Sequence, residues 1–394
     1  LLVKNNVSGK NVSLVVEKTD LNKALNVIHG QIFGVSKKIN LAIFGHGNVG
    51  GTLINQILDS HESIEKRKGI DLRIFAVANS KKVLFRAKGI REDWSEELGL
   101  NGNDYGIKDI IDFAQDHHLE NLIAVDNTAS ADFVSHYEKL ILHGFDLVSS
   151  NKIANTLSFD FYRSIRQELA ANQKQYLYET NVGAGLPLID TIKLLHLSGE
   201  NITRIKGVFS GSLSYIFNTF SEKESVFSSI VQEAMEKGYT EPDPREDLSG
   251  NDVGRKLLIL ARELDLQNEF EDIAIDNLIP SELRAIGFEE FLKAIKTMDT
   301  KFAEIKKNQK DGFVLRYIGD LHGDLQKDKG ILEAKLVSVP KESALGQVKG
   351  SDSIIEIYTE SYGENPLVIQ GAGAGAAVTA RGVFGDILRI AEKA

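Results

Sequence analysis

The sequence predicts an α/β protein built in two successive parts, a parallel sheet with helices on both faces and then a separate α+β domain. Strand-like and helix-like apolar patterns alternate from residue 37 to about residue 154, as in parallel sheets whose strands are joined by helices. After residue 155 this rhythm is lost, and helical segments are followed by stretches of alternating apolar and polar residues. With 394 residues, 42% of them hydrophobic, the chain is long enough to form two cores.

Each expected element rests on the period of its apolar residues. In the first part, the expected elements are strand 39–44, helix 48–59, strands 71–78 and 121–126, helix 131–142 and strand 145–149. In the second part, they are helices 155–171, 186–197, 211–237 and 248–265, followed by strands 312–319, 332–339 and 353–359. The last stretch is glycine-rich and then helical, and we expect this helix to return to the first domain. Its candidate buried positions are Val378, Val383, Ile387, Leu388 and Ile390.

Composition argues against several classes of function. The net charge of -10 opposes the release of counterions that drives binding to nucleic acids, and no apolar run approaches the roughly 18 to 20 residues that span a bilayer. Nucleic-acid and membrane partners are therefore not expected. Because the opening residues lack a basic and then apolar leader, we expect a cytoplasmic protein. The absence of cysteine rules out disulfides, thiolate metal sites and covalent catalysis by a thiol.

The opening residues form a small unit that cannot bury itself. Residues 11–16 alternate like a strand, and Thr19 or Asp20 can cap a following helix. The segment must therefore pack against the body of the protein or against a region outside this chain. The apolar face of the expected helix carries Leu21, Ala24, Leu25 and Ile28.

A glycine-rich loop follows the first strand of the first part. It carries Gly45, Gly47, Asn48, Val49 and Gly50, and an apolar helix pattern follows. Gly45 would permit the tight turn, Gly47 would let a pyrophosphate approach the backbone, and Gly50 would let the helix pack closely. The free amides and the dipole of the helix N-terminus suit phosphate groups. We interpret the first part as a Rossmann-type nucleotide-binding domain, although an ordinary tight turn would also explain the glycines.

The end of the second strand indicates which nicotinamide cofactor would bind. An acidic residue there selects NAD, and a cation accommodates the 2′-phosphate of NADP. The sequence has Asn79 and Ser80, then Lys81 and Lys82, and no acid. NADP(H) is therefore favoured, because a carboxylate would repel the phosphate, and NAD(H) is the alternative. The lysines could equally be solvated loop residues.

An acid-rich segment at 238–256 contains two charged residues that can carry chemistry. Asp252 and Lys256 are four residues apart, so they share one face of the helix expected there. A lysine ammonium can hydrogen-bond an aldehyde oxygen and supply charge or a proton as hydride arrives, and the nearby carboxylate can keep that lysine charged. Glu241 and Asp247 could bind a substrate ammonium group. A solvent-facing ion pair is the alternative interpretation.

Several motifs resemble those of homoserine dehydrogenases. The segment 238–256, with 209–215 (Phe-Ser-Gly-Ser-Leu-Ser-Tyr) upstream, is similar to the signature of that family. The loop 179–187, the run 150–152 and the glycine-rich stretch 370–375 match further family motifs. With the glycine loop, the resemblance covers about residues 37–394. It implies the NAD(P)H-dependent interconversion of L-aspartate 4-semialdehyde and L-homoserine, in threonine, methionine and isoleucine biosynthesis.

The resemblance also implies roles for individual residues. Lys256 would donate a proton and stabilise the developing oxyanion, and Asp252 would orient both the substrate and that lysine. Lys152 would lie beside the nicotinamide, as a second acid-base group or as an electrostatic support, so which lysine supplies the proton stays open. Further substrate contacts would come from Glu241, Asp247 and Tyr239, and further cofactor contacts from Thr128 and Gly375.

A monovalent cation, sodium or potassium, is a further implication of the resemblance. Its ligands would be the Glu179 carboxylate and the backbone carbonyls of Val182, Ala184 and Leu186. Hard oxygen ligands suit such an ion. Alternatively, the glycines around Ala184 only form a sharp turn, and Glu179 is solvated.

The resemblance suggests four regions. Residues 1–36 are similar to the end of an ACT-type regulatory domain, so the chain would be the C-terminal part of a bifunctional aspartokinase/homoserine dehydrogenase; a free-standing dehydrogenase with a short extension is the alternative. Residues 37–154 would bind the nucleotide, 155–370 would bind substrate and mediate dimerisation, and 371–394 would return to the nucleotide-binding domain. A homo-oligomer, dimer or tetramer, is expected.

Two competing functions can be weighed on the sequence. Oxidative phosphorylation of the same semialdehyde uses a cysteine nucleophile to form an acyl-enzyme, and the chain has no cysteine. A non-catalytic NADP-sensing module would keep the glycine loop, but it would have no use for Asp252 and Lys256 beside an acid-rich substrate loop. Hydride transfer to the aldehyde needs no covalent intermediate with the enzyme, and it is the reaction that we expect.

Overall fold

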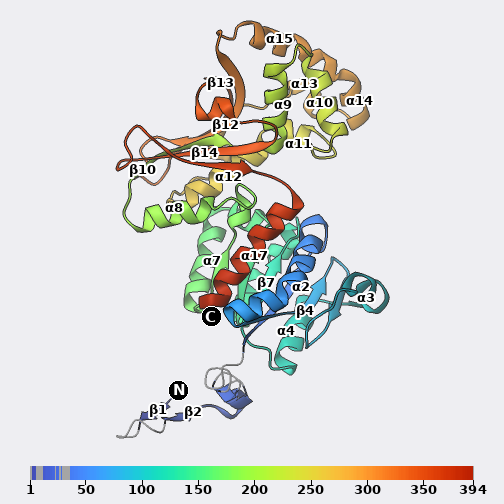
Figure 1. Cartoon of the computed structure of the whole chain (residues 1–394), viewed down its shortest axis with the longest axis vertical. Coiled ribbons are helices and arrows are strands. Elements are labelled where there is room, and N and C mark those ends of the chain that lie inside the picture. The colour runs from blue at the N-terminus through green and yellow to red at the C-terminus, as the bar shows by residue number, and fades with distance from the viewer. Residues whose placement is uncertain (1, 6–11, 23, 26–27, 29–35, 394) are drawn as a thin grey trace.

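The computed structural model describes residues 2–5, 12–22, 24–25, 28 and 36–393. Figure 1 shows the second domain at the top, the first domain below it, and the N-terminal segment at the far end. The α/β fold expected from the sequence is confirmed, since the described residues form a seven-stranded sheet in the first domain and a six-stranded sheet in the second.

The first domain is built on a sheet in the order β6-β5-β4-β3-β7-β8-β9. Its parallel strands are β3 (Lys37–Phe44), β4 (Ile70–Ala78), β7 (Leu122–Asp126), β8 (Phe145–Ser149) and β9 (Tyr176–Leu177). Strand β3 has its successor β4 on one side and β7 on the other, so the order of the strands reverses there. In open α/β sheets, ligands bind at the carboxyl ends of the strands at such a point.

Two antiparallel strands at the edge of this sheet are not predicted from the sequence. They are β5 (Lys82–Phe85), which pairs with β4, and β6 (Asn103–Asp104), which pairs with β5. Strands of four and two residues are too short to show a clear period of two. The sheet is therefore parallel in its centre and mixed at one edge.

The first sheet also extends beyond the predicted boundary at residue 154. The helix α7 (Phe159–Ala171) leads into β9, which pairs in parallel with β8. Strand β8, helix α7 and strand β9 thus form a β-α-β unit. The helix predicted at 155–171 consequently covers the first sheet instead of opening the second domain.

The helices of the first domain differ from the prediction in length and number. Helix α2 (Asn48–Lys68) continues past the predicted end at residue 59 and stops at Gly69, whose φ of 65° suits a glycine C-cap. The predicted helix 131–142 is divided into α5 (Ala131–Val134) and α6 (Tyr137–Leu142). The sequence analysis missed α3 (Trp94–Asn101) and α4 (Ile107–Asp116), although the buried residues of α4 have helical spacing.

The last helix, α17 (Ala376–Lys393), lies along α2 in the first domain (Figure 1). Alternate residues of β3 face two different cores, and Ile39, Leu41 and Ile43 share their core with α2 and α17. Of the positions expected to be buried on α17, Val378 and Leu388 are half-buried. Its buried apolar side chains are Ala380, Val383, Phe384, Ile387, Ile390 and Ala391.

The second domain is a sheet in the order β11-β13-β12-β10-β14-β15, antiparallel except for the pair β11 and β13. Its strands are β10 (Ile202–Val208), β11 (Ala274–Ile275), β12 (Phe313–His322), β13 (Ile331–Pro340), β14 (Asp352–Thr359) and β15 (Leu367–Ala372). Helices α9 (Gly211–Glu222) and α12 (Asn251–Arg262) pack against β12.

One long helix predicted for the second domain is two helices. The segment 211–237 contains α9 and α10 (Phe227–Glu236), and the chain between them is extended at Lys223 and Val226. Helix α8 (Leu188–Leu197) follows the prediction closely. The remaining helices are α11 (Arg245–Leu248), α13 (Ser281–Arg284), α14 (Phe288–Ala294), α15 (Asp299–Lys307) and α16 (Ala344–Gln347).

The N-terminal segment contains the hairpin β1 (Leu2–Asn5) and β2 (Val12–Val15) and a 3-10 turn, Lys18–Asp20. Figure 1 shows it projecting away from the two domains. Val15, Leu21 and Leu25 are exposed, and part of the helix expected after Asp20 lies outside the described residues. Across the described residues, no helix is long and apolar enough to cross a bilayer.

Candidate functional site

The glycine loop joins β3 to α2 at the carboxyl edge of the sheet. Gly45 has a φ of 84°, and a Cβ there would lie 2.8 Å from the carbonyl oxygen of Asn127. A Cβ at Gly50 would lie only 1.9 Å from the carbonyl oxygen of Gly45, whereas one at Gly47 would have no atom within 4 Å. Two glycines are thus required by the loop itself, and the third leaves open space before the amides of Asn48 and Val49. This arrangement fits a dinucleotide pyrophosphate.

The turn after β4 is organised by Asn79. Its Oδ1 accepts hydrogen bonds of 2.8 Å from the backbone amides of Lys81 and of Lys82. Its Nδ2 lies 3.3 Å from Nε2 of His46 in the glycine loop, while Ser80 is exposed. Asn79 therefore shapes the turn where a ribose would lie, and its side-chain oxygen is already used.

A buried carboxylate holds the ends of β7 and β8 together. Asp126 accepts hydrogen bonds from the amide of Thr128 (2.8 Å), from Tyr137 Oη (2.7 Å) and from Asn151 Nδ2 (3.0 Å). Burial raises the pKa of Asp126 despite these donors. The network fixes the Thr128 loop and the residue just before Lys152. The sequence analysis missed Asp126 and Tyr137, although an acidic residue ending a buried strand is a visible signal.

Helix α12 brings Asp252 and Lys256 together and presents them to Lys152 of the first domain. The Nζ of Lys256 lies 2.7 Å from Oδ2 of Asp252, and the Nζ of Lys152 lies 3.5 Å from Oδ1 of the same carboxylate. Burial would raise the pKa of Asp252, but the charges of the two lysines outweigh it and hold this pKa well below its usual range. In place of the solvent-facing pair considered from the sequence, the Lys256 side chain is only 10% exposed, while that of Asp252 is 42% exposed.

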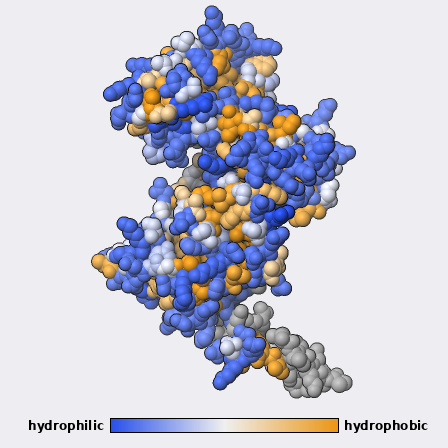
Figure 2. Space-filling model, turned by 180° about the vertical axis from the view of Figure 1, so that it is seen from behind, coloured by the Kyte–Doolittle hydropathy of each residue, from blue (hydrophilic) through white to orange (hydrophobic). Residues whose placement is uncertain are grey.

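Lys256 has one donor left for a ligand. Its Nζ donates to the carbonyl oxygen of Phe209 at 2.7 Å as well as to Asp252. An ammonium group has three N–H donors, so two are used by described residues and one is free. Figure 2 shows that the outline of the molecule narrows between its upper and lower parts.

The acid-rich loop lies next to the start of α9. Oδ2 of Asp247 accepts a hydrogen bond of 2.8 Å from the backbone amide of Glu241, and its carboxylate also bonds to the Ser212 hydroxyl. Burial raises the pKa of Asp247. The Glu241 side chain is exposed, and the Tyr239 ring stacks on the Tyr215 ring with 4.3 Å between centroids. Asp247 is thus built into the site, whereas Glu241 faces the solvent.

Gly375 immediately precedes α17. It has a φ of 121°, and a Cβ there would meet no atom within 4 Å. The amide of Thr379 donates to the Gly375 carbonyl oxygen at 3.0 Å, which closes the first turn of the helix. The N-termini of α2 and α17 point toward the same end of the first domain, the end that faces the second domain (Figure 1).

Comparison with known proteins identifies the family. A model described as homoserine dehydrogenase matches residues 187–388, and one described as the NAD-binding domain of homoserine dehydrogenase matches residues 45–179. A homoserine dehydrogenase of Schizosaccharomyces pombe is 36% identical over 89% of this chain and 95% of its own length. The chain belongs to the homoserine dehydrogenase family.

Longer proteins are also similar to this chain. A bifunctional aspartokinase/homoserine dehydrogenase of Arabidopsis thaliana, named as chloroplastic, is 39% identical over 97% of this chain but 42% of its own length. A bifunctional enzyme of Buchnera aphidicola is 37% identical over 99% of this chain and 47% of its own length. The chain therefore spans less than half the length of these bifunctional relatives.

Solved structures show the same fold. A protein of unknown function from Candida auris is 33% identical, with a TM-score of 0.81 over 91% of this chain and 99% of that one. A hyperthermophilic archaeal homoserine dehydrogenase in complex with NADPH is 21% identical, with a TM-score of 0.67 over 91% of this chain and 98% of that one. At that identity, the second comparison supports the fold alone.

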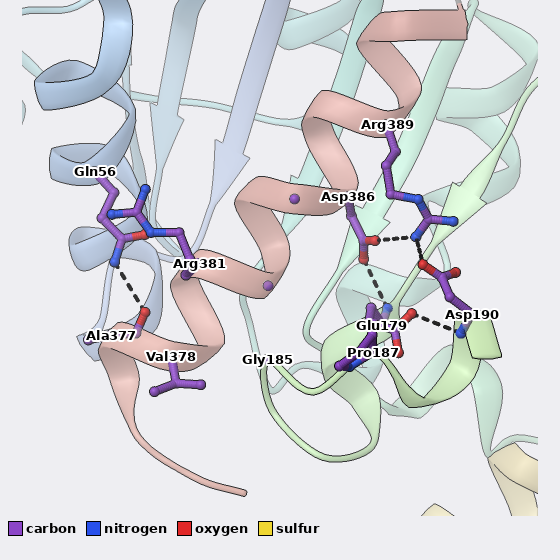
Figure 3. A pocket seen from close by; sticks show the side chains of 12 residues that line it. Gln56, Glu179, Gly185, Pro187, Asp190, Ala377, Val378, Arg381, Asp386 and Arg389 are labelled. Atoms are coloured by element: carbon purple, nitrogen blue, oxygen red, sulfur yellow. Dashed lines mark hydrogen bonds and ion pairs between the residues drawn. The ribbon is translucent and has the colours of Figure 1, made fainter. Parts of the chain in front are cut away.

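Glu179 lies in a cavity of about 540 Å³ between α2, α17 and the start of α8 (Figure 3). Its two carboxylate oxygens accept hydrogen bonds from the amides of Ile189 (2.7 Å) and Asp190 (3.0 Å), so it caps α8. Burial and then the charges of Asp190 and Asp386 raise the pKa of Glu179 to about 8. The solvated Glu179 considered from the sequence is therefore not observed.

The other cation ligands implied for homoserine dehydrogenases lie on the loop after Glu179. Val182 and Ala184 are buried, Leu186 is half-buried, and Ala184 has a φ of 55°. The Leu186 carbonyl oxygen accepts a hydrogen bond of 2.9 Å from the amide of Leu188. A carboxylate whose pKa is raised in a buried site has the chemistry of a cation ligand, because a bound positive charge would offset the cost of burying it.

Two further residues near the acid-rich loop have no role assigned from the sequence. Ser212 reaches Asp247 from the first turn of α9, and the Thr240 hydroxyl is buried without a hydrogen-bond partner among the described residues. A buried hydroxyl without a partner suits a ligand contact. Both residues lie inside the motifs that resemble those of homoserine dehydrogenases, so the sequence indicated these two segments but not these two residues.

Proposed function

We propose that the chain interconverts L-aspartate 4-semialdehyde and L-homoserine with a nicotinamide cofactor. The observation that carries this proposal is the cluster of Lys256, Asp252 and Lys152, in which the third N–H of Lys256 has no acceptor among the described residues. The cluster lies at the junction of the two domains, beside the strand ends that bind ligands in open α/β sheets. Membership of the homoserine dehydrogenase family supports the same reaction.

The residues of this chain would perform the proton chemistry at the aldehyde. The free N–H of Lys256 donates to the aldehyde oxygen, and its charge offsets the negative charge that develops there. Lys256 then passes a proton to that oxygen to give the alcohol, or accepts it in the reverse direction. Asp252 orients Lys256 through their ion pair, and Lys152 adds positive charge or acts as a second acid-base group. When bound, the cofactor supplies or accepts the hydride.

The amino-acid end of the substrate would be held by the acid-rich loop. Asp247 and Glu241 would receive the ammonium group, and Asp247 would stay fixed by the Glu241 amide. Tyr239 would close the site from the side where its ring stacks on Tyr215. This placement leaves the C4 aldehyde to reach Lys256.

We propose NADP(H) as the preferred cofactor, with NAD(H) as the alternative. The support is the absence of an acid at residues 79–82 and the lysines at 81 and 82. The cofactor contacts would be Gly45, Gly47, Asn48, Val49 and Gly50 at the pyrophosphate, Asn79 and Ser80 at the ribose, and Thr128, Lys152 and Gly375 toward the nicotinamide. Fluorescence titration with NADPH and NADH tests the preference, and tighter binding of NADH would contradict it.

Several broader properties are also proposals. Glu179 and the carbonyls of Val182, Ala184 and Leu186 would bind a sodium or potassium ion. The second domain would mediate a homo-oligomer, dimer or tetramer, which light scattering can test. Aspartokinase activity would belong to a longer protein of which this chain is part, since the bifunctional relatives are more than twice as long. The cytoplasmic location stays a prediction.

The initial rate of NADP reduction with L-homoserine tests the proposed function. We expect turnover by the parent chain and a loss of about a hundredfold in Lys256→Ala, as for removal of a general acid or oxyanion donor. Lys108→Ala is a matched control, because Lys108 and Asp112 form an exposed i,i+4 pair on α4, at the end of the first domain away from the second domain (Figure 1). Nucleotide binding without turnover of homoserine would overturn the proposal and favour the NADP-sensing module.

A further inference from the structure

Lys152 lies at the start of a short turn whose end is buried. A 3-10 turn, Ile153–Asn155, follows Lys152 directly. The amide of Asn155 donates to the carbonyl oxygen of Lys152 at 3.1 Å, and the Asn155 side chain is fully buried. Whatever holds Asn155 therefore also fixes the backbone from which the Lys152 side chain extends.

Asn155 is held by groups from four different elements. Its Oδ1 accepts a hydrogen bond of 2.7 Å from Arg166 on α7, and its Nδ2 donates to Tyr176 Oη at 3.2 Å and to Asn181 Oδ1 at 2.9 Å. Its carbonyl oxygen accepts from Nη1 of Arg262 at 2.8 Å. The first three partners belong to the first domain or to the loop that follows β9, but Arg262 is on the substrate-domain helix α12.

Arg262 itself is fully buried and fixed on both sides. Its Nη2 lies 3.1 Å from Oε2 of Glu269, and Oε1 of Glu269 accepts a 2.8 Å hydrogen bond from the amide of Phe159 at the start of α7. The Arg262 side chain has no exposed surface, while that of Glu269 is 37% exposed. Well-packed apolar residues often replace buried charges without loss of stability, so packing alone does not require a guanidinium here. A charged group at this position needs another reason.

Helix α12 is thus joined to the Lys152 turn near both of its ends. Among the described residues, two polar contacts connect the turn 150–155 to α12, the pair of Lys152 with Asp252 and the bond from Arg262 to Asn155. The ten residues from Asp252 to Arg262 correspond to about 15 Å of helix. Two contacts this far apart fix both the position and the direction of the helix relative to the turn.

We propose that Arg262 is a positioning residue that sets Lys152 against Asp252 by holding the carbonyl of Asn155. It touches neither substrate nor cofactor. The inference rests on the proposed function for its effect on catalysis, because the pair that it positions is the one assigned to hydride-transfer chemistry. A misplacement of about 1 Å can cost about a hundredfold in rate, so a residue two turns beyond Lys256 can influence turnover without contacting the reacting atoms.

A double-mutant cycle between Arg262→Met and Lys152→Met tests this inference in the full chain. We expect Arg262→Met alone to lower kcat by about tenfold or more, with the KM for NADP unchanged within about twofold. In the Lys152→Met background, Arg262→Met should lower kcat by less than about twofold, because the residue through which it acts is already gone. Effects that simply multiply would overturn the proposal. Arg262→Lys, which keeps the buried charge, should recover part of kcat.

A second measurement does not depend on turnover. Lys152 can be acetylated with an amine-reactive acetylating reagent and its rate followed by mass spectrometry, with exposed Lys108 as internal reference. This rate reports whether Lys152 is still held by Asp252. We expect the Lys152 rate to rise by about two- to fivefold in Arg262→Met, the scale of losing a weak ion pair, and to stay unchanged in Arg255→Met, a surface control on the same helix. An unchanged rate in Arg262→Met would overturn the inference. A parent without homoserine turnover would instead overturn the proposed function, and the acetylation result would still decide the role of Arg262.

Discussion

Asp252 lies between two lysines from different domains, with Lys256 Nζ 2.7 Å from one carboxylate oxygen and Lys152 Nζ 3.5 Å from the other. The closer contact is local, since a spacing of four residues places both groups on one face of α12. The longer contact crosses the domain junction. Because the pKa of Asp252 is held below its usual range, the carboxylate is charged at neutral pH.

Replacing Asp252 by asparagine tests the role of this charge. We expect Asp252→Asn to lower kcat by about ten- to a hundredfold, because the amide cannot offset two nearby ammonium groups or orient both lysines. Steady-state rates of NADP reduction with L-homoserine measure the effect. Asp112→Asn, in the exposed pair with Lys108, is the control, and an unchanged kcat in Asp252→Asn would contradict the assignment.

The three glycines of the loop should respond differently to alanine. In Gly50→Ala the new Cβ would lie 1.9 Å from the Gly45 carbonyl oxygen, so we expect a loss of about 1–3 kcal/mol in the free energy of unfolding and weaker nucleotide binding. In Gly47→Ala the Cβ meets no atom, so stability should hold while NADPH affinity falls. Thermal unfolding and fluorescence titration separate the two. Gly99→Ala, also without neighbours within 4 Å, controls for the substitution itself, and equal NADPH affinity in Gly47→Ala would argue against pyrophosphate binding there.

The pKa of Glu179 predicts how stability depends on pH and on sodium. This pKa is raised from 4.5 to about 8, so the folded state binds the proton more tightly than the unfolded state. The protonated Glu179 carboxyl group therefore adds to the free energy of unfolding. This contribution is complete below pH 4.5 and is lost as pH rises through about 8. A cation at the ionised carboxylate would offset this loss, so sodium should raise the midpoint of thermal unfolding at pH 9 more than at pH 6.

The control for this prediction is Glu179→Gln, which cannot ionise. It should unfold with a weaker dependence on pH between 6 and 9 and with no specific response to sodium. Comparing sodium chloride with tetramethylammonium chloride at equal ionic strength separates binding from general screening. The same sodium effect at both pH values, or in the glutamine variant, would count against a cation at Glu179.

The stack of Tyr215 on Tyr239 predicts a specific effect on substrate binding. Tyr215→Leu removes the stack, and we expect the KM for L-homoserine to rise by about two- to tenfold, the value of one aromatic pair. Tyr215→Phe keeps the ring but loses the hydrogen bonds from Tyr215 Oη to Glu233 and from Lys237 to that hydroxyl. Its KM should stay close to that of the parent. Equal KM values for the leucine variant and the parent would show that the stack does not position Tyr239.

Much of the candidate site could be predicted because its signals are local. The order of strand, glycine loop and helix around Gly45 and Gly50 follows from periods of two and 3.6 residues and from glycine geometry. The pairing of Asp252 with Lys256 follows from the four-residue spacing on one helix. The short strand β5 and the break between α9 and α10 carry weaker local signals, and the prediction missed both.

The sequence by itself determined the fold class, the family resemblance and the residue types that carry the chemistry, because each depends on spacing along a single segment. Only the tertiary structure decided that Lys152 reaches Asp252, that Glu179 is buried as a helix cap, and that β9 belongs to the first sheet. The bond from Arg262 to Asn155 joins residues 107 positions apart. No periodicity encodes such a contact, since it exists only when two separately folded elements pack at one distance and one angle.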